Sequence, residues 1–141
     1  MDIAQYIPQN PCICINLRRV AQRVTDYYDR ALKPAGVSLN QYSLLVNIYR
    51  IEGCGTGELA QAVRLEKSTL VRTVQPLLRD GLVTDRSAAT DRRRRLFLTA
   101  EGRAVLVRAY PLWTAAQDEV AARLGKNHDQ LMAFFEALDG L

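Results

Sequence analysis

A change of hydrophobic period near Gly81 constrains the fold of this chain more than any other feature. Residues 66–79 carry leucine and valine three and four positions apart, which is the spacing of one helix face. After Asp80 and Gly81 the period becomes two, in the run LVTDR, and a polar turn, SAATD, separates this run from RRRRLFLT. Alternation on both sides of a polar turn is typical of a β-hairpin. The segment therefore predicts a helix followed by a short hairpin, with the arginines at the start of the returning strand.

Two further helical patterns precede this unit. Ser38 and Gln41 have the spacing of a capping box, so we expect a helix that begins at Ser38, runs through QYSLLVNIYRIEG and stops near Gly53. Thr56 is expected to cap a short third helix, GELAQAV, which a tight connection joins to the helix at 66–79. Two helices in tight succession followed by a basic hairpin indicate a winged helix-turn-helix, here residues 37–99.

Long helices are predicted at both ends of the chain. Residues 12–33 repeat apolar side chains at helical spacing, and a second long helix follows the hairpin with Pro111 inside it, where proline should kink or break the helix. The last helix, within 127–141, has an apolar stripe that needs a partner surface. We predict a single mainly α unit with a small β-hairpin, in which residues 1–36 and 100–141 are dimerisation helices.

Basic charge gathers in one segment. The formal net charge is +4, yet residues 64–95 alone hold nine basic and four acidic side chains, a local net of +5. Four adjacent arginines, Arg92 to Arg95, repel one another and cannot be buried unpaired. Such a run is usually a solvated face, but its place in a hairpin directly after a helix pair favours a strongly negative partner. The cluster predicts a surface for double-stranded DNA.

The helix at 66–79 has a second face suited to a DNA groove. Opposite its leucines lie small hydroxyls and one arginine, which make a poor core. With the basic hairpin, this face gives the predicted DNA-binding residues: Lys67, Ser68, Thr69, Arg72, Thr73, Arg86, Asp91, Arg92, Arg93, Arg94 and Arg95.

The block STLVRTVQPLLRDGLV, with Asp91-x-Arg93 farther along, resembles the MarR/SlyA family of winged-helix transcriptional regulators along nearly the whole chain. The resemblance implies that the hydroxyl-bearing face enters the major groove and that Asp91 orients Arg93 toward the minor groove or its phosphates. It also implies a homodimer joined by the terminal helices, bound to an inverted-repeat operator. The expected function is repression, relieved by a small ligand or by thiol oxidation.

Three cysteines, Cys12, Cys14 and Cys54, are too few and odd in number for a disulfide scaffold, which suits a reducing compartment. The sequence also resembles the organic-hydroperoxide-sensing branch of the family, in which a reactive cysteine stands three residues before a leucine, as Cys14 does before Leu17. The resemblance implies that Cys14 is the sensor and that Tyr28 hydrogen-bonds its thiolate. The late resolving cysteine of that branch has no counterpart here, but Cys12 lies nearby, and a sulfenic acid can condense with a neighbouring thiol. A buried structural thiol, or the wall of a pocket for a small apolar or aromatic effector, is the alternative.

Other function classes find less support in the sequence. A metal or arsenic sensor would draw soft ligands from Cys12 and Cys14 with Cys54 or His128, but no CxxC pair accompanies them. A thiol-dependent enzyme would need a base beside its cysteine, and His128 is the only histidine. Gly-rich phosphate loops, HExxH and GxSxG elements are absent, so we predict no enzymatic activity, no cofactor and no metal. With no signal-peptide pattern and no apolar run of about 20 residues, we predict a cytoplasmic protein without a membrane partner.

Overall fold

The computed structural model describes residues 1–141, and most of them are helical. The elements are α1 (Ile13–Leu32), α2 (Leu39–Arg50), α3 (Thr56–Val63), α4 (Lys67–Arg79), β1 (Val83–Asp85), β2 (Leu96–Leu98), α5 (Ala100–Leu124) and α6 (His128–Leu138). Short 3-10 turns lie at Ile3–Tyr6, Lys33–Ala35 and Gly125–Asn127. The predicted mainly α fold with one small hairpin is confirmed. None of the helices combines the length and the apolar character needed to span a bilayer.

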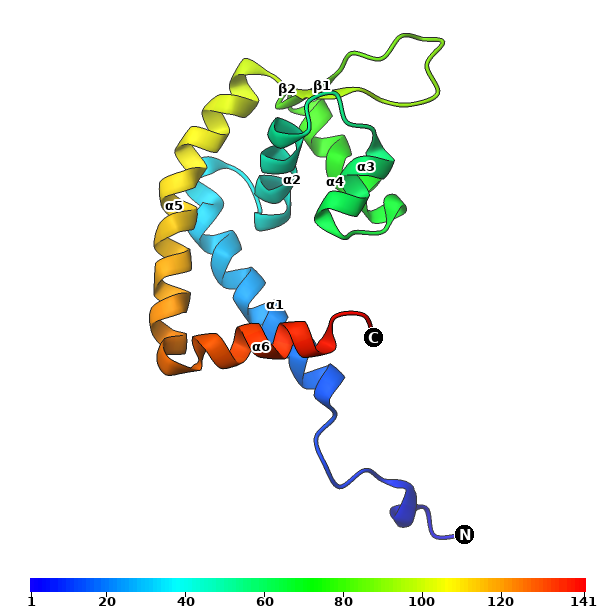
Figure 1. Ribbon diagram of the computed structural model, residues 1–141, viewed down its shortest axis with the longest axis vertical. Helices are drawn as coiled ribbons and strands as arrows, with labels where there is room; N and C mark the ends of the chain where they lie inside the picture. The colour runs from blue at the N-terminus through cyan, green and yellow to red at the C-terminus, as the bar shows by residue number, and fades with distance from the viewer.

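Figure 1 shows two parts of the molecule. Helices α2, α3 and α4 gather with the hairpin at one end, and the loop of the hairpin projects away from them. Helices α1 and α5 run side by side away from this body, and α6 turns back from the far end of α5. The N-terminal residues extend beyond the helices.

One hydrophobic core holds the helices and the hairpin together. Most of its fully buried side chains come from α2, α3, α4 and β2, with Leu32 of α1 and Ala109 of α5 beside them, and they include Leu44, Leu45, Ile48, Leu59, Leu70, Val74, Leu77 and Leu96. The predicted stripe of α4 is therefore the buried one, which turns the opposite face of α4 toward solvent.

Helix starts follow local hydrogen bonding, with one correction. The capping box at Ser38 is confirmed, because the amides of Ser38 and Gln41 each donate to the other's side chain, at 3.0 and 3.2 Å. The predicted cap at Thr56 is wrong by one residue: Gly55 takes the N-cap position, and its amide donates to the Glu58 carboxylate at 3.4 Å.

Helix α5 continues through Pro111 without a break, and Figure 1 shows it as a bowed helix. The predicted break is therefore absent. Because a proline inside a helix removes one backbone hydrogen bond, the curvature of α5 has a local cause at this residue.

The apolar faces of the terminal helices are only partly covered. Tyr28 and Leu32, near the end of α1, are buried. Nine other large apolar side chains of α1 and α6 are open to solvent, and we call them the terminal apolar face: Ile13, Ile15, Leu17, Val20, Val24, Met132, Phe134, Phe135 and Leu138.

The hairpin is fastened to the start of α5 at a very close backbone approach. Thr99 donates from its amide to the Leu82 carbonyl at 3.1 Å and from its hydroxyl to the Gly81 carbonyl at 2.6 Å, and its hydroxyl accepts from the Gly102 amide at 3.0 Å. A Cβ atom added to Gly102 would lie 2.1 Å from the Leu82 carbonyl oxygen. Only glycine fits there without movement of the backbone.

We therefore expect Gly102→Ala to lower the free energy of unfolding by about 1–3 kcal/mol or more, as overpacking does. Gly57→Ala is the matched control, because a Cβ at this helical position meets nothing within 4 Å. It should raise the free energy of unfolding by up to about 1 kcal/mol, since alanine loses less conformational entropy than glycine. Urea denaturation of both variants measures the two values, and equal effects would contradict the close contact.

Candidate nucleic-acid interface

Helix α4 presents a polar face opposite its buried stripe. Lys67, Ser68 and Arg72 are exposed, and Thr69 and Thr73 are half-buried. The Thr73 hydroxyl donates to the Thr69 carbonyl at 2.9 Å, and the Arg72 guanidinium lies 3.5 Å from the Thr69 hydroxyl. Ser68 and Arg72 are therefore the outermost groups of the predicted face, with the two threonines at its edge.

Two exposed residues that we did not predict extend this face. Gln75 and Arg79 lie three and seven positions after Arg72, on the same side of the helix. Helix α4 continues past Pro76 to Arg79, where the guanidinium pairs with Asp80 at 3.1 Å. Gln75 is uncharged, so only its helical spacing from Arg72 could have predicted its place on this face.

The wing, residues 83–98, is an antiparallel hairpin with a long loop. Its register pairs Val83 with Leu98 and Asp85 with Leu96, so β2 begins at Leu96. The prediction that the arginines start the returning strand is wrong, because Arg92–Arg95 all precede it. They stand in the loop instead.

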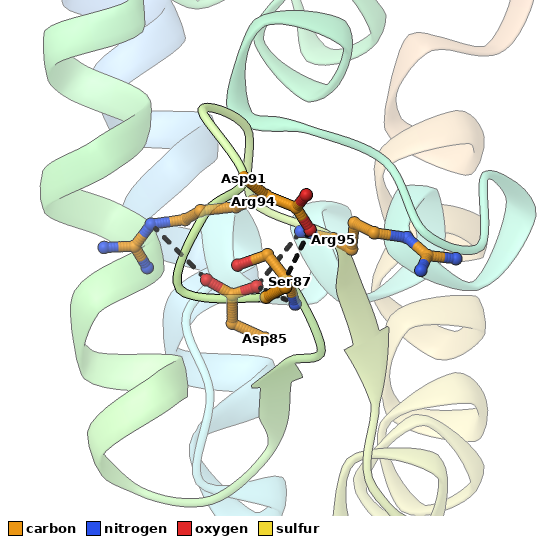
Figure 2. Close-up of polar contacts among 6 residues, drawn as sticks. Asp85, Ser87, Asp91, Arg94 and Arg95 are labelled. Carbon is orange, nitrogen blue, oxygen red and sulfur yellow. Dashed lines mark hydrogen bonds and ion pairs between the residues drawn. The ribbon is translucent and has the colours of Figure 1, made fainter.

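Asp85 holds the neck of the wing loop (Figure 2). Its Oδ1 atom accepts hydrogen bonds from the amides of Ser87, at 2.9 Å, and Arg95, at 3.1 Å, and its Oδ2 atom lies 4.0 Å from Nε of Arg94. The amide of Arg86 also donates to the Arg95 carbonyl at 2.9 Å. One carboxylate thus bonds both ends of the loop.

Asp91 closes the turn within the loop. Its carboxylate accepts from the Ala88 amide at 2.7 Å, and its own amide donates to the Ala88 carbonyl at 2.9 Å. No ion pair joins Asp91 to Arg93, so the orienting contact implied by the resemblance is absent in this structure. The physical reason is that the local turn directs the Asp91 carboxylate toward the Ala88 amide.

The basic residues of the wing are not equivalent. Arg94 pairs with Asp85, as described, while Arg86 and Arg95 lie over the ring of Phe97, with guanidinium carbons 4.4 and 5.9 Å from its centroid. Such contacts between a cation and an aromatic face are attractive. Three of the five wing arginines thus have partners in the protein.

Arg92 and Arg93 are the remaining two, and they differ from the others. Both are exposed, and neither side chain makes an ion pair or a hydrogen bond in the structure. Their charges are therefore free to meet an external anion.

A positively charged cleft opens between the wing loop and the start of α3. It has a volume of about 510 Å³ and no hydrophobic lining, and its residues are Gly55, Thr56, Gly57, Glu58, Gln61, Lys67, Arg92, Arg93 and Arg94. Four cations face a single carboxylate there. We did not predict the contribution of α3, whose only signal is the sequence Gly-Thr-Gly at its start. The arrangement suits phosphate groups, which bind guanidinium and ammonium side chains.

The electrostatics of Asp85 match its contacts. Partial burial alone would raise the pKa of the Asp85 carboxyl, but hydrogen bonds from the Arg95 and Ser87 amides and the charge of Arg94 outweigh it and hold this pKa below its ordinary value. The carboxylate is thus stabilised in its charged form at the neck of the wing.

The candidate sensor residues do not meet within one chain. Cys12 and Cys14 are exposed at the start of α1, whereas Tyr28 lies fourteen residues later, roughly 21 Å along the helix axis. The Tyr28 hydroxyl donates to Gln117 of α5, and burial, with Tyr27 nearby, raises the pKa of Tyr28. The implied hydrogen bond between Tyr28 and the Cys14 thiolate is therefore not formed inside a single chain.

The ligands of the alternative metal sensor are also apart. Cys54 is buried in the core, where burial raises the pKa of its thiol, and His128 lies beside Asp129 at 3.6 Å on the surface. The structure contains no group of three histidine, cysteine or acidic side chains arranged to hold a metal ion. One chain does not assemble Cys12 and Cys14 with either partner.

A family model and two curated transcriptional regulators match this chain in sequence. The model of the MarR family matches residues 35–94. The HTH-type transcriptional regulator BilQ of Clostridium symbiosum is 32% identical over 94 residues, which cover 66% of this chain and 65% of BilQ. The transcriptional regulator HosA of Escherichia coli is 30% identical over 116 residues, which cover 82% of this chain and 84% of HosA.

Solved structures agree with these relatives. The M. tuberculosis transcriptional regulator MosR superposes with a TM-score of 0.78 at 33% identity, and the match covers 95% of this chain and all of MosR. The same regulator in complex with DNA gives a TM-score of 0.72 at 37% identity, over 92% of this chain and 99% of MosR.

The lowered pKa of Asp85 predicts how the wing responds to acid. A carboxylate whose folded-state pKa is depressed stabilises the fold fully above the ordinary aspartate pKa of about 3.9, and this contribution is lost as the pH falls through the lowered value. Asp85→Asn should therefore cost roughly 0.5–1.5 kcal/mol of unfolding free energy at pH 7 and less as the pH falls below about 4. Chemical denaturation at several pH values measures the difference. Asp118→Asn, which removes an exposed carboxylate without hydrogen bonds, is the control, and a pH-independent cost at Asp85 would contradict the assignment.

Proposed function

The chain belongs to the MarR family of transcriptional regulators, and from this membership we propose that it is a homodimeric repressor that binds an inverted-repeat operator in double-stranded DNA. The observation that carries the proposal is the pairing of two exposed polar surfaces, which meet at the cleft lined by Lys67 and the wing arginines. One is the polar face of α4, and the other is the wing with its free arginines. The DNA-bound structure of MosR, at 37% identity, supports the same partner.

We propose that the polar face of α4 reads the major groove. Arg72 stands at its centre and is long enough to reach base edges or phosphates, and arginine is the commonest specific partner of guanine there. Ser68 lies one turn before it, with Thr69 and Thr73 at the edge and Lys67 at the start of the helix. Lysine in that place suits a phosphate contact.

The wing would contact the flanking minor groove and its phosphates. Arg92 and Arg93 are the proposed groove residues, because both are exposed and neither forms an ion pair within the protein. A narrow minor groove concentrates negative potential and attracts arginine. Arg86, Arg94 and Arg95 would contribute charge from the base of the wing.

The proposed dimer rests on the terminal apolar face. Its side chains are open to solvent in a single chain, and aromatic and aliphatic groups gathered in this way indicate a protein interface. A second copy offers an identical face, and a symmetric dimer requires only one such patch. Two α4 helices related by twofold symmetry would read half-sites one helical turn apart, about 34–36 Å between centres.

Release from DNA would be triggered by a small ligand or by thiol oxidation. For the second route, a hydroperoxide would oxidise the Cys14 thiolate to a sulfenic acid and leave as the alcohol. The sulfenic acid would then condense with the Cys12 thiol to give a disulfide and water. The supporting observation is that both thiols are exposed and two residues apart at the start of α1, beside Ile13 of the terminal apolar face.

The proposal also covers location and chemistry. A repressor acts where the chromosome is, so we propose a cytoplasmic location. The relatives are transcriptional regulators, and we propose that this chain has no catalytic activity, cofactor or metal of its own.

The DNA-binding proposal predicts that the full chain selects an inverted repeat from a pool of random duplexes and binds it as two chains per duplex. Phosphate contacts release counterions, so a plot of log affinity against log salt should have a slope of roughly −4 or steeper. Selection followed by sequencing, analytical ultracentrifugation and a salt titration measure these outcomes. Weak binding to every duplex without dependence on salt would overturn the proposal.

Arg72→Ala should weaken binding to the selected duplex by roughly 1–3 kcal/mol, the range for a base or close phosphate contact. Lys126→Ala is the control, because it removes the same charge from the turn between α5 and α6, at the end of the molecule opposite the wing (Figure 1). Equal effects of the two substitutions would mean that α4 provides only diffuse charge.

The thiol route predicts that substoichiometric cumene hydroperoxide releases the protein from the selected duplex and that dithiothreitol restores binding. Cys14→Ser should abolish the response, while Cys12→Ser should leave a sulfenic acid that a dimedone probe labels. If wild type and Cys14→Ser respond alike, release belongs to a small ligand instead.

A further inference from the structure

We infer that Asp85 is a positioning residue for DNA binding, because its carboxylate holds both ends of the wing loop and so presents Arg92 and Arg93 to the DNA. The inference rests on the proposed function. The Asp85 carboxylate contacts the protein and would not touch the nucleic acid. The family resemblance implies no role for Asp85.

Asp85 is the one side chain whose carboxylate accepts hydrogen bonds from both arms of the wing loop. Asp85 is the last residue of β1 and lies opposite Leu96, the first residue of β2, so ten loop residues follow it before the hairpin resumes. Its Oδ1 atom bonds the Ser87 amide on the outgoing side and the Arg95 amide on the returning side. Figure 2 shows the carboxylate between the two arms. Charge-assisted hydrogen bonds of this type are stronger than those between neutral groups.

The contact with Arg94 decides which arginines remain free. The Arg94 guanidinium and the Asp85 carboxylate are 35% and 27% exposed, so this pair is partly shielded from water. While Asp85 engages Arg94, the two preceding arginines form no ion pair with any carboxylate of the protein. Asp85 thus fixes Arg94 in the structure and leaves Arg92 and Arg93 without an ion pair.

A rigid neck matters because the loop has few other supports. The Asp91 carboxylate bonds only within the loop, and the other contacts at the neck are the hydrogen bond from the Arg86 amide to the Arg95 carbonyl and the arginines over Phe97. A loop that is already ordered pays less conformational entropy when it binds than one that orders on the DNA. Loss of the Asp85 bonds would therefore appear as weaker binding.

The inference predicts the opposite change in DNA affinity from the one that charge repulsion alone predicts. Removing a negative charge beside a DNA-binding surface reduces repulsion and should strengthen binding. If Asp85 positions the wing, removing its charge should instead weaken binding. The direction of the change therefore separates the two accounts.

The test measures affinity of full-length variants for the selected duplex at fixed salt. Asp85→Ala should weaken binding roughly five- to twentyfold, comparable to the loss of one arginine contact. Asp85→Asn should weaken it less, since its amide oxygen can still accept from the Ser87 and Arg95 amides but cannot pair with Arg94. Glu66→Gln is the matched control: it removes an exposed carboxylate next to α4 that makes no hydrogen bond or ion pair, and it should bind equally or more tightly.

A double-mutant cycle distinguishes positioning from a general loss of stability. In a chain that carries Arg92→Ala and Arg93→Ala, the further change Asp85→Ala should have little effect on affinity, because no free arginine remains to be positioned. An undiminished effect in that background, or unchanged or tighter binding by Asp85→Ala alone, would overturn the inference. Failure of the wild-type chain to select any duplex would instead overturn the proposed function, and the inference with it.

Discussion

Leu96 is the residue on which the geometry of the proposed DNA-binding surface depends. It is fully buried, and its backbone accepts from the Gly53 amide at 2.9 Å and donates to the Cys54 carbonyl at 3.0 Å, while its other edge pairs with β1. The connection between α2 and α3 therefore forms an isolated β-bridge beside the two-stranded hairpin, between Cys54 and Leu96. Because Leu96 belongs to both the core and the wing, packing of the helices also sets where the wing leaves the body. The cleft between the wing loop and α3 exists because this bridge places the two segments side by side.

The sequence predicted those features that depend on interactions between residues close together in the chain. The capping box at Ser38 and the stripe of Leu70 and Val74 depend on residues within one or two turns, so the sequence was enough to place these helices and their faces. The partner of a charged side chain is a different kind of question. Asp91 and Asp85 lie six positions apart in one polar stretch, and which of them meets an arginine depends on the path of a ten-residue loop.

The same difference explains what was missed at the surface. Gln75 carries no charge and lies among leucines in the sequence, and only the completed helix shows that it continues the face of Arg72. The start of α3 joins the cleft through the bridge at Leu96, a contact between segments some forty residues apart. The terminal apolar face was predictable from its spacing, but a single chain leaves it open. Its role therefore stays a prediction until the oligomeric state is measured.

The close approach at Gly102 couples the position of the hairpin to the direction of α5. Because the start of this helix is in van der Waals contact with the Leu82 backbone, the hairpin cannot slide along it and must follow it. Pro111 lies nine residues farther on, roughly 14 Å along the axis, so a change of about 5° in the bend there displaces the base of the wing by about 1 Å. The position of the wing therefore depends directly on the curvature of α5. In the proposed dimer, a small change in the bend of α5 in both chains would therefore change the distance between the two wings.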